Sequence, residues 1–330
     1  MKILVTGASG MLGRTVAQAL IDHGHDVTVM QRRPTELDCS EVRGDIRDPE
    51  AIRAATIGQH AVLHLAARVS PTGRWQEFFD VNVGGTRNLV AASQSSGVSR
   101  FVYVSSPAVA SSGAAHVGVG ALPADPATTK SHYARSKAEA ERFVLGLNDP
   151  NMAVAAIRPH LVWGPGDEQL VARIIDRAAS GALRLIGSGA ALVDSTYVDN
   201  AADAMVAALD RIDDINGRAL VVSNGEPRPV AELLRGLCDA ACVQMPSGSV
   251  SPTAAKSIGA LVEAVWAAGR ITRDPPMTRF LAEQLSTAHW YDQRETQALL
   301  DWVPAVSLDE GLQRLRLSMA DADLGSTSSR

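Results

Sequence analysis

A glycine-rich turn near the amino terminus restricts the possible folds of this chain more than any other feature. Residues 7–13 read GASGMLG, and they lie between an apolar run at residues 2–6 and an apolar-periodic segment at residues 11–23. The three glycines allow positive φ angles, a close approach of backbone N–H groups to a pyrophosphate, and tight packing of the helix on the strand. The pattern therefore predicts a strand, a phosphate-binding turn and a helix, as at the start of a dinucleotide-binding fold.

Apolar runs and amphipathic segments continue to alternate after this unit. Strands are expected at residues 2–6, 27–30, 42–45, 61–65, 101–104 and 153–157, and helices at residues 11–23, 49–55, 75–96 and 133–145. Continuous apolar strands between helices indicate a parallel sheet that is covered on both faces. We predict an α/β protein with a Rossmann-type doubly wound parallel sheet and a smaller C-terminal substrate-binding lobe.

The pattern becomes less regular after residue 157, which limits how precisely the domains can be divided. Helices are expected around residues 169–179 and 201–209, and strands at residues 183–186 and 219–222. We predict a dinucleotide-binding domain over residues 1–160 with interleaved later segments, a substrate-binding lobe mainly over residues 161–320, and a flexible polar tail over residues 321–330.

Composition and charge exclude several classes of partner. The 330 residues are 46% hydrophobic and carry a net charge of -5 without long blocks of one sign, so no nucleic-acid or anionic lipid surface is expected. Three cysteines are too few for a disulfide scaffold, and no metal site is predicted. Small molecules are the expected partners.

The sequence also bears on where the protein is found. The chain opens directly with a strand-like segment and lacks the pattern of a signal peptide, so a cytoplasmic protein is expected. The apolar stretch at residues 258–269 contains Glu263 and is shorter than the roughly 20 residues that cross a bilayer, so no integral membrane segment is expected. This stretch is expected to pack in the core, to form an interface, or to cover an apolar substrate entrance.

The residues after the second predicted strand bear on the choice of nicotinamide cofactor. An acidic residue there would accept a hydrogen bond from the ribose 2′-hydroxyl of NAD, but the chain has Gln31, Arg32 and Arg33 instead. An arginine guanidinium suits a 2′-phosphate, although a solvated basic turn would look the same. NADP is therefore the predicted cofactor, and NAD is the alternative.

A tyrosine and a lysine four residues apart form the core of the predicted catalytic site. Tyr133 and Lys137 share one face of a predicted helix, and Ser105 and Ser106 end the fifth predicted strand. A ketone that accepts hydride needs a proton donor and a second hydrogen bond at its oxygen. We predict that Tyr133 is the acid/base, that Lys137 lowers its pKa and contacts the nicotinamide ribose, and that Ser106 is the second donor, with Ser105 as the alternative.

Two further segments complete the predicted site. Asn82 is expected to hydrogen-bond backbone or a water chain behind the lysine, and an ordinary polar contact inside a helix is the alternative. Residues 107–131 form a long run of small residues directly before Tyr133, which predicts a loop that shapes the substrate pocket.

In this order, the motifs resemble the extended short-chain dehydrogenase/reductase superfamily over nearly the whole chain. The landmarks are residues 7–13, 44–48, 64–67, 82–86, 101–106, 133–137 and 158–167. Within it, the chain looks most like the 3β-hydroxysteroid dehydrogenase branch, and is similar to bacterial 2-alkyl-3-oxoalkanoate reductases. That likeness is carried by residues 132–141, 159–167, 197–202, 275–280, 287–291 and 306–312.

The resemblance implies the same roles for Ser106, Tyr133 and Lys137, and it places Pro159 and His160 beside the nicotinamide. Asp45 and Ile46 are expected to hold the adenine, and Ala66 and Ala67 to let the backbone approach the cofactor. The residues expected to contact the cofactor are Gly7, Ser9, Gly10, Met11, Gly13, Arg32, Arg33, Asp45, Ile46, Ala66, Ala67, Asn82, Ser105, Tyr133, Lys137, Pro159, His160 and Val162.

The predicted function is an NADP(H)-dependent oxidoreductase that interconverts a ketone (3-oxo) group and a secondary alcohol on a hydrophobic substrate, steroid-like or a long-chain β-keto acid. A NAD-dependent nucleotide-sugar epimerase or dehydratase is the second possibility, with Arg173, Arg177, Arg218 and Arg228 available to a diphosphate. A non-catalytic dinucleotide-sensing regulator is the third. The resemblance also implies a homodimer that forms through the helices at residues 75–96 and 133–145.

Overall fold

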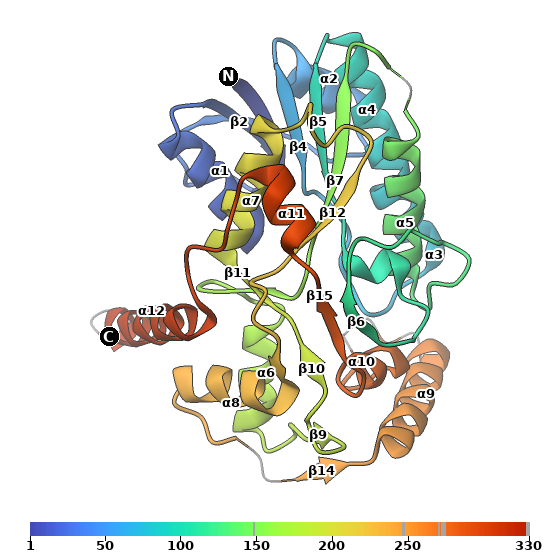
Figure 1. Ribbon diagram of the computed structural model, residues 1–330, viewed down its shortest axis with the longest axis vertical. Helices are drawn as coiled ribbons and strands as arrows, with labels where there is room; N and C mark the ends of the chain where they lie inside the picture. Colours follow the sequence, from blue (N-terminus) through green and yellow to red (C-terminus); the bar gives the residue numbers. More distant parts are fainter. Residues whose placement is uncertain (148, 246–247, 270, 272–274, 328–330) are drawn as a thin grey trace.

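The computed structural model describes residues 1–147, 149–245, 248–269, 271 and 275–327. A seven-stranded sheet has the strand order β12-β7-β5-β4-β1-β2-β3, and every pair of neighbours in it is parallel (Figure 1). Its strands are β1 (Lys2–Thr6), β2 (Asp26–Gln31), β3 (Ser40–Arg43), β4 (Ala61–His64), β5 (Arg100–Val104), β7 (Ala153–Pro159) and β12 (Ala219–Val222). The predicted doubly wound parallel sheet is confirmed.

Helices cover both faces of this sheet, because successive strand residues point to opposite sides. In β1, Ile3 and Val5 pack in the core cluster under α1 and α7, whereas Leu4 packs in the cluster under α2, α4 and α5. These helices are α1 (Met11–Asp22), α7 (Val198–Asp210), α2 (Pro49–Thr56), α4 (Thr86–Ser95) and α5 (His132–Leu145). The α7 helix and strand β12 come late in the sequence, so the chain returns to the first lobe after building part of the second.

The helical run after β4 differs from the single long helix that the sequence predicts for residues 75–96. It consists of α3 (Trp75–Phe78), a π-helical segment η1 (Phe79–Gly85) and then α4. A π-helical turn holds more residues than an α-helical turn and often marks a functional site. At Gly85 the backbone lies so close to Ile46 that a Cβ atom added to Gly85 would be 2.7 Å from the Cγ2 atom of Ile46.

The second lobe combines short strands with helices around its own core, which contains Trp163, Leu237 and Leu315. It lies below the large sheet in Figure 1. Its strands are β8 (Val162–Trp163), β9 (Leu185–Ile186), β10 (Leu192–Val193), β11 (Thr196–Tyr197), β13 (Arg228–Pro229), β14 (Ser249–Val250) and β15 (His289–Tyr291). Its helices are α6 (Val171–Ala179), α8 (Val230–Ala240), α9 (Pro252–Gly269), α10 (Arg279–Gln284) and α12 (Leu308–Thr327), while α11 (Arg294–Leu300) packs on α7 and β12.

The segment between Ser106 and Tyr133 is more ordered than the predicted loop over residues 107–131. It contains the 3₁₀ helix η2 (Pro107–Ala110) and the strand β6 (His116–Val119). Strand β6 joins a four-stranded sheet of order β13-β10-β15-β6, in which His116 is the register partner of His289. Its strand partner is more than 160 residues away in the sequence, so no local pattern could have predicted this strand.

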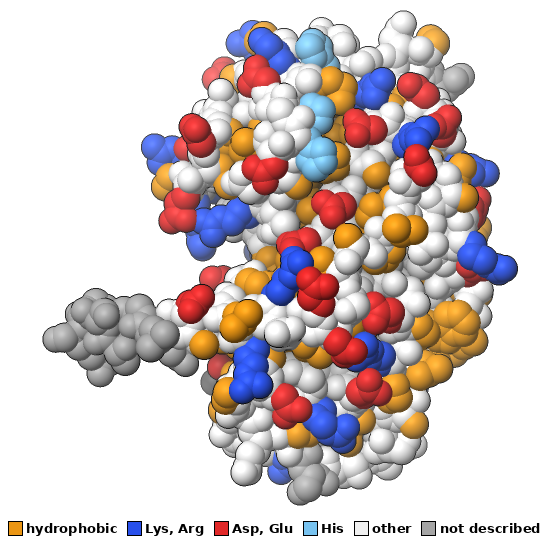
Figure 2. All heavy atoms as spheres, turned by 60° about the vertical axis from the view of Figure 1, so that its left-hand side comes forward, with side chains coloured by type: hydrophobic (Ala, Val, Ile, Leu, Met, Phe, Trp, Pro, Cys, Tyr) orange, Lys and Arg blue, Asp and Glu red, His pale blue; other side chains and the backbone are white. Residues whose placement is uncertain are grey.

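The surface of the second lobe includes the apolar stretch singled out in the sequence. Residues Ile258, Leu261 and Val265 of α9 are exposed, so the expected core packing is absent for these three side chains. Among the described residues, no helix combines the length and the hydropathy that a bilayer crossing requires. Lysines and arginines are interspersed with acidic side chains on the face drawn in Figure 2.

The predicted tail begins inside helix α12. Residues 321–327 belong to this helix, and residues 328–330 lie outside the described part of the chain.

Candidate active site

The three predicted catalytic residues come from two neighbouring elements at the carboxyl end of the sheet. Ser106 follows β5, and its Oγ atom accepts a hydrogen bond of 3.3 Å from the backbone N of Ala108, which caps η2. Tyr133 and Lys137 lie on α5, whose N-cap residue Ser131 accepts a hydrogen bond of 3.1 Å from the backbone N of Ala134. The Ser106 side chain lies close enough to the Tyr133 phenol to act on its pKa.

Burial dominates the titration of both α5 residues. It raises the pKa of Tyr133 to about 12, although the hydrogen bond with Ser106 opposes this rise. Burial also lowers the pKa of Lys137 to about 7, and the charge of Glu141 acts in the opposite direction. The sequence predicts that Lys137 lowers the pKa of Tyr133, but in this structure the phenol is held in its neutral, proton-donating form.

Lys137 is directed at the end of strand β5. Its Nζ atom donates a hydrogen bond of 2.6 Å to the carbonyl of Val104 and lies 4.1 Å from the centroid of the Tyr103 ring. An ammonium has three N–H donors and a neutral amine has two, and this contact uses one of them. Lys137 is therefore fixed in place and retains donors for another acceptor.

Ser105 differs from Ser106 in its surroundings. Its backbone N donates to the carbonyl of Ile157 at 2.6 Å, while its Oγ atom is buried and has no hydrogen-bond partner among the described residues. Buried hydroxyls nearly always have a partner. A ligand on this side of the sheet would supply one, which supports the expected cofactor contact of Ser105.

The glycine turn has the geometry that a nucleotide pyrophosphate needs. Gly7 has a φ of +83°, and a Cβ there would lie 2.7 Å from the backbone N of Ala66; a Cβ on Gly13 would lie 2.3 Å from the carbonyl O of Gly7. Ser9 and Gly10 are exposed, and no side chain caps the first turn of α1 at Met11. The amide groups of this helix start are therefore available to a phosphate, so the residues present fit a dinucleotide.

The residues expected around the adenosine lie at the ends of β2 and β3. Arg32 and Arg33 are both exposed. Asp45 accepts two hydrogen bonds from the guanidinium of Arg47, at 2.8 and 2.9 Å, and these hydrogen bonds lower the pKa of Asp45 to about 2. The charge of Arg32 also acts on Asp45, so the two groups are neighbours. Ile46 is largely buried against η1.

Asn82 lies in η1 and joins the loop after β4 to helix α5. Its Oδ1 atom accepts from the backbone N of Arg68 at 2.7 Å, and its Nδ2 atom donates to the Arg68 carbonyl at 3.1 Å and to Ser136 Oγ at 2.8 Å. The predicted backbone contact of Asn82 is therefore present. The loop that it holds contains Ala66 and Ala67, both partly buried.

Sequence reasoning missed the contribution of strand β15 to this end of the sheet. His160, next to Pro159, is 3.0 Å from His289, measured between Nε2 and Nδ1, and its ring also meets the Tyr291 ring at a centroid distance of 5.1 Å. Val162 pairs with Thr196 in the short sheet of β8 and β11. Only a run of polar and aromatic residues marks β15 in the sequence, too short to predict its place.

A buried ion pair was also missed. Arg158 donates to Glu141 through Nε at 2.9 Å and through Nη2 at 2.5 Å, and its Nη1 atom donates to the carbonyl of Leu122 at 2.6 Å. The two side chains are 2% and 1% exposed. The pair ties α5 to β7 and to the segment that contains β6. An arginine at the end of an apolar strand is the signal that could have indicated it.

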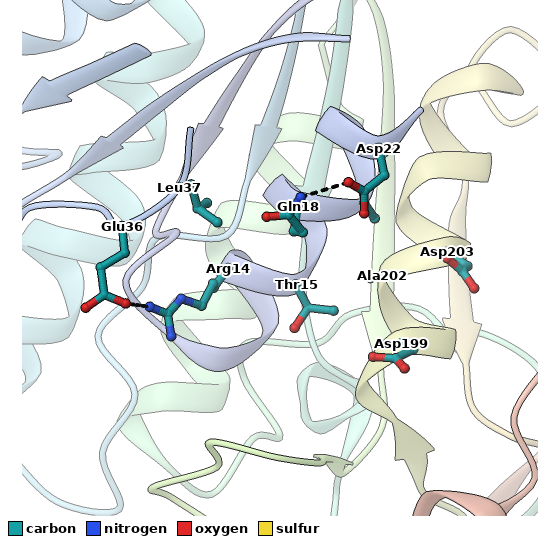
Figure 3. A pocket seen from close by; sticks show the side chains of 10 residues that line it. Arg14, Thr15, Gln18, Asp22, Glu36, Leu37, Asp199, Ala202 and Asp203 are labelled. Atoms are coloured by element: carbon teal, nitrogen blue, oxygen red, sulfur yellow. Dashed lines mark hydrogen bonds and ion pairs between the residues drawn. The ribbon is translucent and has the colours of Figure 1, made fainter. Parts of the chain in front are cut away.

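A cavity of about 630 Å³ lies away from these residues, between α1, α7 and the segment after β2 (Figure 3). None of the predicted site residues lines it. Several of its polar side chains are already paired: Arg14 with Glu36, Gln18 with Asp22, and Asp199 with Arg314. In the described part of the chain, no group of three His, Cys, Asp or Glu side chains is arranged to hold a metal ion.

Comparisons with known proteins agree with this geometry. Residues 3–223 match the model of the NAD dependent epimerase/dehydratase family. The chain is 40% identical to a 2-alkyl-3-oxoalkanoate reductase of Stenotrophomonas maltophilia, covering 97% of this chain and 100% of the relative. It is 33% identical to a 3-beta-hydroxysteroid dehydrogenase of Mycolicibacterium neoaurum, covering 76% of this chain and 73% of the relative.

A solved structure shares the fold. It is a short-chain dehydrogenase/reductase superfamily protein from Agrobacterium tumefaciens with bound NAD, with a TM-score of 0.75 and 21% identity over 100% of both chains. The relatives are reductases and dehydrogenases, so the predicted class of nicotinamide-dependent oxidoreductases is confirmed. The chain belongs to the NAD dependent epimerase/dehydratase family, within the extended short-chain dehydrogenases/reductases.

Proposed function

We propose that this protein is an NADP(H)-dependent oxidoreductase that interconverts a 3-oxo group and a secondary alcohol on a hydrophobic substrate. The observation that carries the proposal is the placement of the Ser106 hydroxyl beside the Tyr133 phenol, where it acts on the pKa of Tyr133, with Lys137 fixed one helical turn away. Two hydroxyl donors at one point are what the oxygen of a ketone needs while negative charge develops on it.

The chain's own residues account for the acid/base half of the reaction. A reduced nicotinamide, when bound, supplies the hydride that forms the new C–H bond at the carbonyl carbon. Tyr133 gives its phenolic proton to the carbonyl oxygen, and Ser106 donates a hydrogen bond to the same oxygen. Lys137 stabilises the phenolate that remains until a proton from solvent replaces the one transferred. In the direction of alcohol oxidation, each of these transfers is reversed.

A hydrophobic substrate is supported by the relatives. Two relatives bear the names of a 2-alkyl-3-oxoalkanoate reductase and a 3-beta-hydroxysteroid dehydrogenase, both of which act on largely apolar molecules. We propose a long-chain 3-oxo acid or a 3-oxosteroid as the substrate class.

The residues at the end of β2 support NADP(H) over NAD(H). Arg32 is exposed beside Asp45, where a 2′-phosphate on the adenosine would meet its guanidinium. Arg32→Ala is expected to raise the Kd for NADPH about tenfold or more and to leave the Kd for NADH nearly unchanged, because only NADPH carries the phosphate. Fluorescence titration measures both constants.

Arg53→Ala is the matched control, because Arg53 is also exposed but lies on α2. The Arg53→Ala variant should change neither the Kd for NADPH nor the Kd for NADH. An equal loss of NADH and NADPH affinity in Arg32→Ala would show that the arginine supports the loop rather than the phosphate, and would remove the argument for NADP(H).

The proposed function is tested by measuring NADPH and NADH binding and then the decay of nicotinamide absorbance with β-keto acyl compounds, 3-ketosteroids and UDP-sugars. Turnover of a hydrophobic ketone with NADPH supports the proposal. Epimerisation restores its NAD in each cycle and leaves the nicotinamide absorbance unchanged, so NAD that is retained through purification, together with conversion of only the nucleotide sugars, followed by chromatography, would identify an epimerase. Arg228, one candidate for a diphosphate site, already pairs with Asp309 at 2.6 Å and with Glu226 at 3.2 Å, which argues against that outcome.

A further inference from the structure

A histidine buried at the end of β4 lies in the middle of a chain of hydrogen bonds. The backbone N of Ala66 donates to Thr6 Oγ1 at 3.2 Å, and Thr6 Oγ1 lies 2.7 Å from His64 Nδ1. On the other side of the ring, His64 Nε2 lies 2.9 Å from Thr86 Oγ1, which donates to the carbonyl of Asn82 at 2.6 Å. His64, Thr6, Thr86 and Asn82 are each no more than 1% exposed, so solvent offers these groups no alternative partners.

The chain continues from Asn82 into the catalytic helix. The side-chain Nδ2 atom of Asn82 donates to Ser136 Oγ at 2.8 Å, and Ser136 Oγ donates to the carbonyl of Tyr133 at 2.8 Å. The side-chain amide of Asn82 cannot be flipped to exchange Oδ1 and Nδ2, because Oδ1 accepts a hydrogen bond from the backbone N of Arg68. The two stretches of hydrogen bonds meet at Asn82, whose backbone carbonyl ends the first and whose side-chain amide begins the second, so the covalent frame of this residue joins the loop after β4 to the first turn of α5.

Chemistry allows only one direction for these hydrogen bonds. The Asn82 carbonyl can only accept, so Thr86 gives it its single hydroxyl proton and must itself accept from His64 Nε2. A neutral imidazole has one N–H, so His64 Nδ1 accepts from Thr6, and Thr6 accepts from the amide of Ala66. Burial and the charge of Lys137 lower the pKa of His64 to about 3, which keeps the ring neutral.

The two ends of this chain lie in the two halves of the site. Ala66 touches the glycine turn, where a Cβ on Gly7 would lie 2.7 Å from its backbone N. Tyr133 is the proposed acid, at the start of the helix that also holds Lys137. Hydrogen bonds that point in one direction polarise each other, so loss of one weakens the others on its side of Asn82, and the two sides are coupled through the position of Asn82 itself.

We infer that His64 is a positioning residue, which through this directional chain fixes the cofactor loop at Ala66 relative to the first turn of α5 at Tyr133. The inference rests on the proposed function, because it takes the loop at Ala66 as part of the nicotinamide nucleotide site. It predicts that breaking the chain at either end has the same consequence for nucleotide binding.

The test uses the two ends of the chain and NADPH as the probe. Thr6→Val and Ser136→Ala each remove one hydroxyl, and each is expected to raise the Kd for NADPH about tenfold. In the double variant we expect the same tenfold rise, because the chain is already broken, and not the hundredfold product of two independent effects. Ser93→Ala is the matched control, since Ser93 is buried in α4 and its hydroxyl has no partner among the described residues.

Two more variants separate positioning from stability. Thr6→Ser keeps the hydroxyl and loses only a methyl group, so it should bind NADPH like the wild type even where thermal unfolding shows it to be less stable. His64→Leu should reproduce the Kd of Thr6→Val. If His64→Leu does not fold, Thr86→Val removes the bond on the other side of the ring and should give the same Kd.

Each remaining outcome overturns the inference. A Ser136→Ala variant with the wild-type Kd, a double variant that shows the product of the single effects, or a Thr6→Ser variant as weak as Thr6→Val would each exclude a connected chain. Wild-type protein that binds neither NADPH nor NADH would overturn the proposed function first, and the inference with it.

Discussion

Replacing Tyr133 with phenylalanine is expected to lower kcat with NADPH and a 3-oxo substrate by about 10²- to 10⁴-fold, the usual contribution of a positioned general acid. The phenol is held neutral by burial, which raises its pKa to about 12, so it carries the proton that the carbonyl oxygen needs throughout the neutral range. The ring remains in Tyr133→Phe, so the Kd for NADPH should change little. Stopped-flow absorbance and fluorescence titration measure the two quantities.

Tyr197→Phe is the control for this prediction, because Tyr197 is a buried tyrosine in the core of the second lobe. It should retain the wild-type kcat. A Tyr133→Phe enzyme with nearly full turnover would transfer the acid role to another donor. A loss of kcat that is matched by a loss of NADPH binding would instead indicate that the hydroxyl holds the nucleotide.

Breaking the ion pair between Arg158 and Glu141 is expected to destabilise the protein more than any other substitution considered. Arg158→Met should lower the free energy of unfolding by about 3–5 kcal/mol, because it leaves a buried carboxylate without its partner. The double variant Arg158→Met/Glu141→Leu removes both charges and should recover most of that loss. Urea denaturation of the two variants measures the difference.

Arg211→Met is the matched control on the surface. Arg211 pairs with Asp301 at 2.7 Å, but the two side chains are 45% and 79% exposed, so its loss should cost less than about 1 kcal/mol. If Arg158→Met cost no more than Arg211→Met, the buried pair would contribute nothing specific to the stability of α5.

Much of the first lobe could be predicted because its signals are local. The glycine turn, the apolar strands and the Tyr133–Lys137 spacing each act within a few residues, and the parallel sheet follows from their alternation. The π-helical segment before α4 could not be predicted, because hydrophobic periodicity does not distinguish it from an α-helix, and its close approach to Ile46 joins residues about 40 positions apart. A periodicity of 3.6 residues was the best description available from the sequence alone.

The second lobe was harder to predict from the sequence, because the contacts that form its sheet join residues that are distant in the sequence. The segment before Tyr133 reads as a loop, since nothing near His116 indicates the strand partner at His289.

The pKa of Tyr133 was expected to fall beside Lys137, but the structure shows that burial dominates. Burial of a side chain is a property of the folded chain, and spacing alone cannot give its extent.

The pairing of β6 with β15 has a consequence for the order in which the protein assembles. Ordering the segment between Ser106 and Tyr133 requires a strand that is synthesised about 170 residues later, and closing so long a loop is entropically costly and slow. On a ribosome, the large sheet can gather most of its strands while this segment still lacks its partner. We therefore expect the segment between Ser106 and Tyr133 to become ordered late in folding, so that chains ending before β15 would have the glycine turn without the finished substrate side of the proposed site.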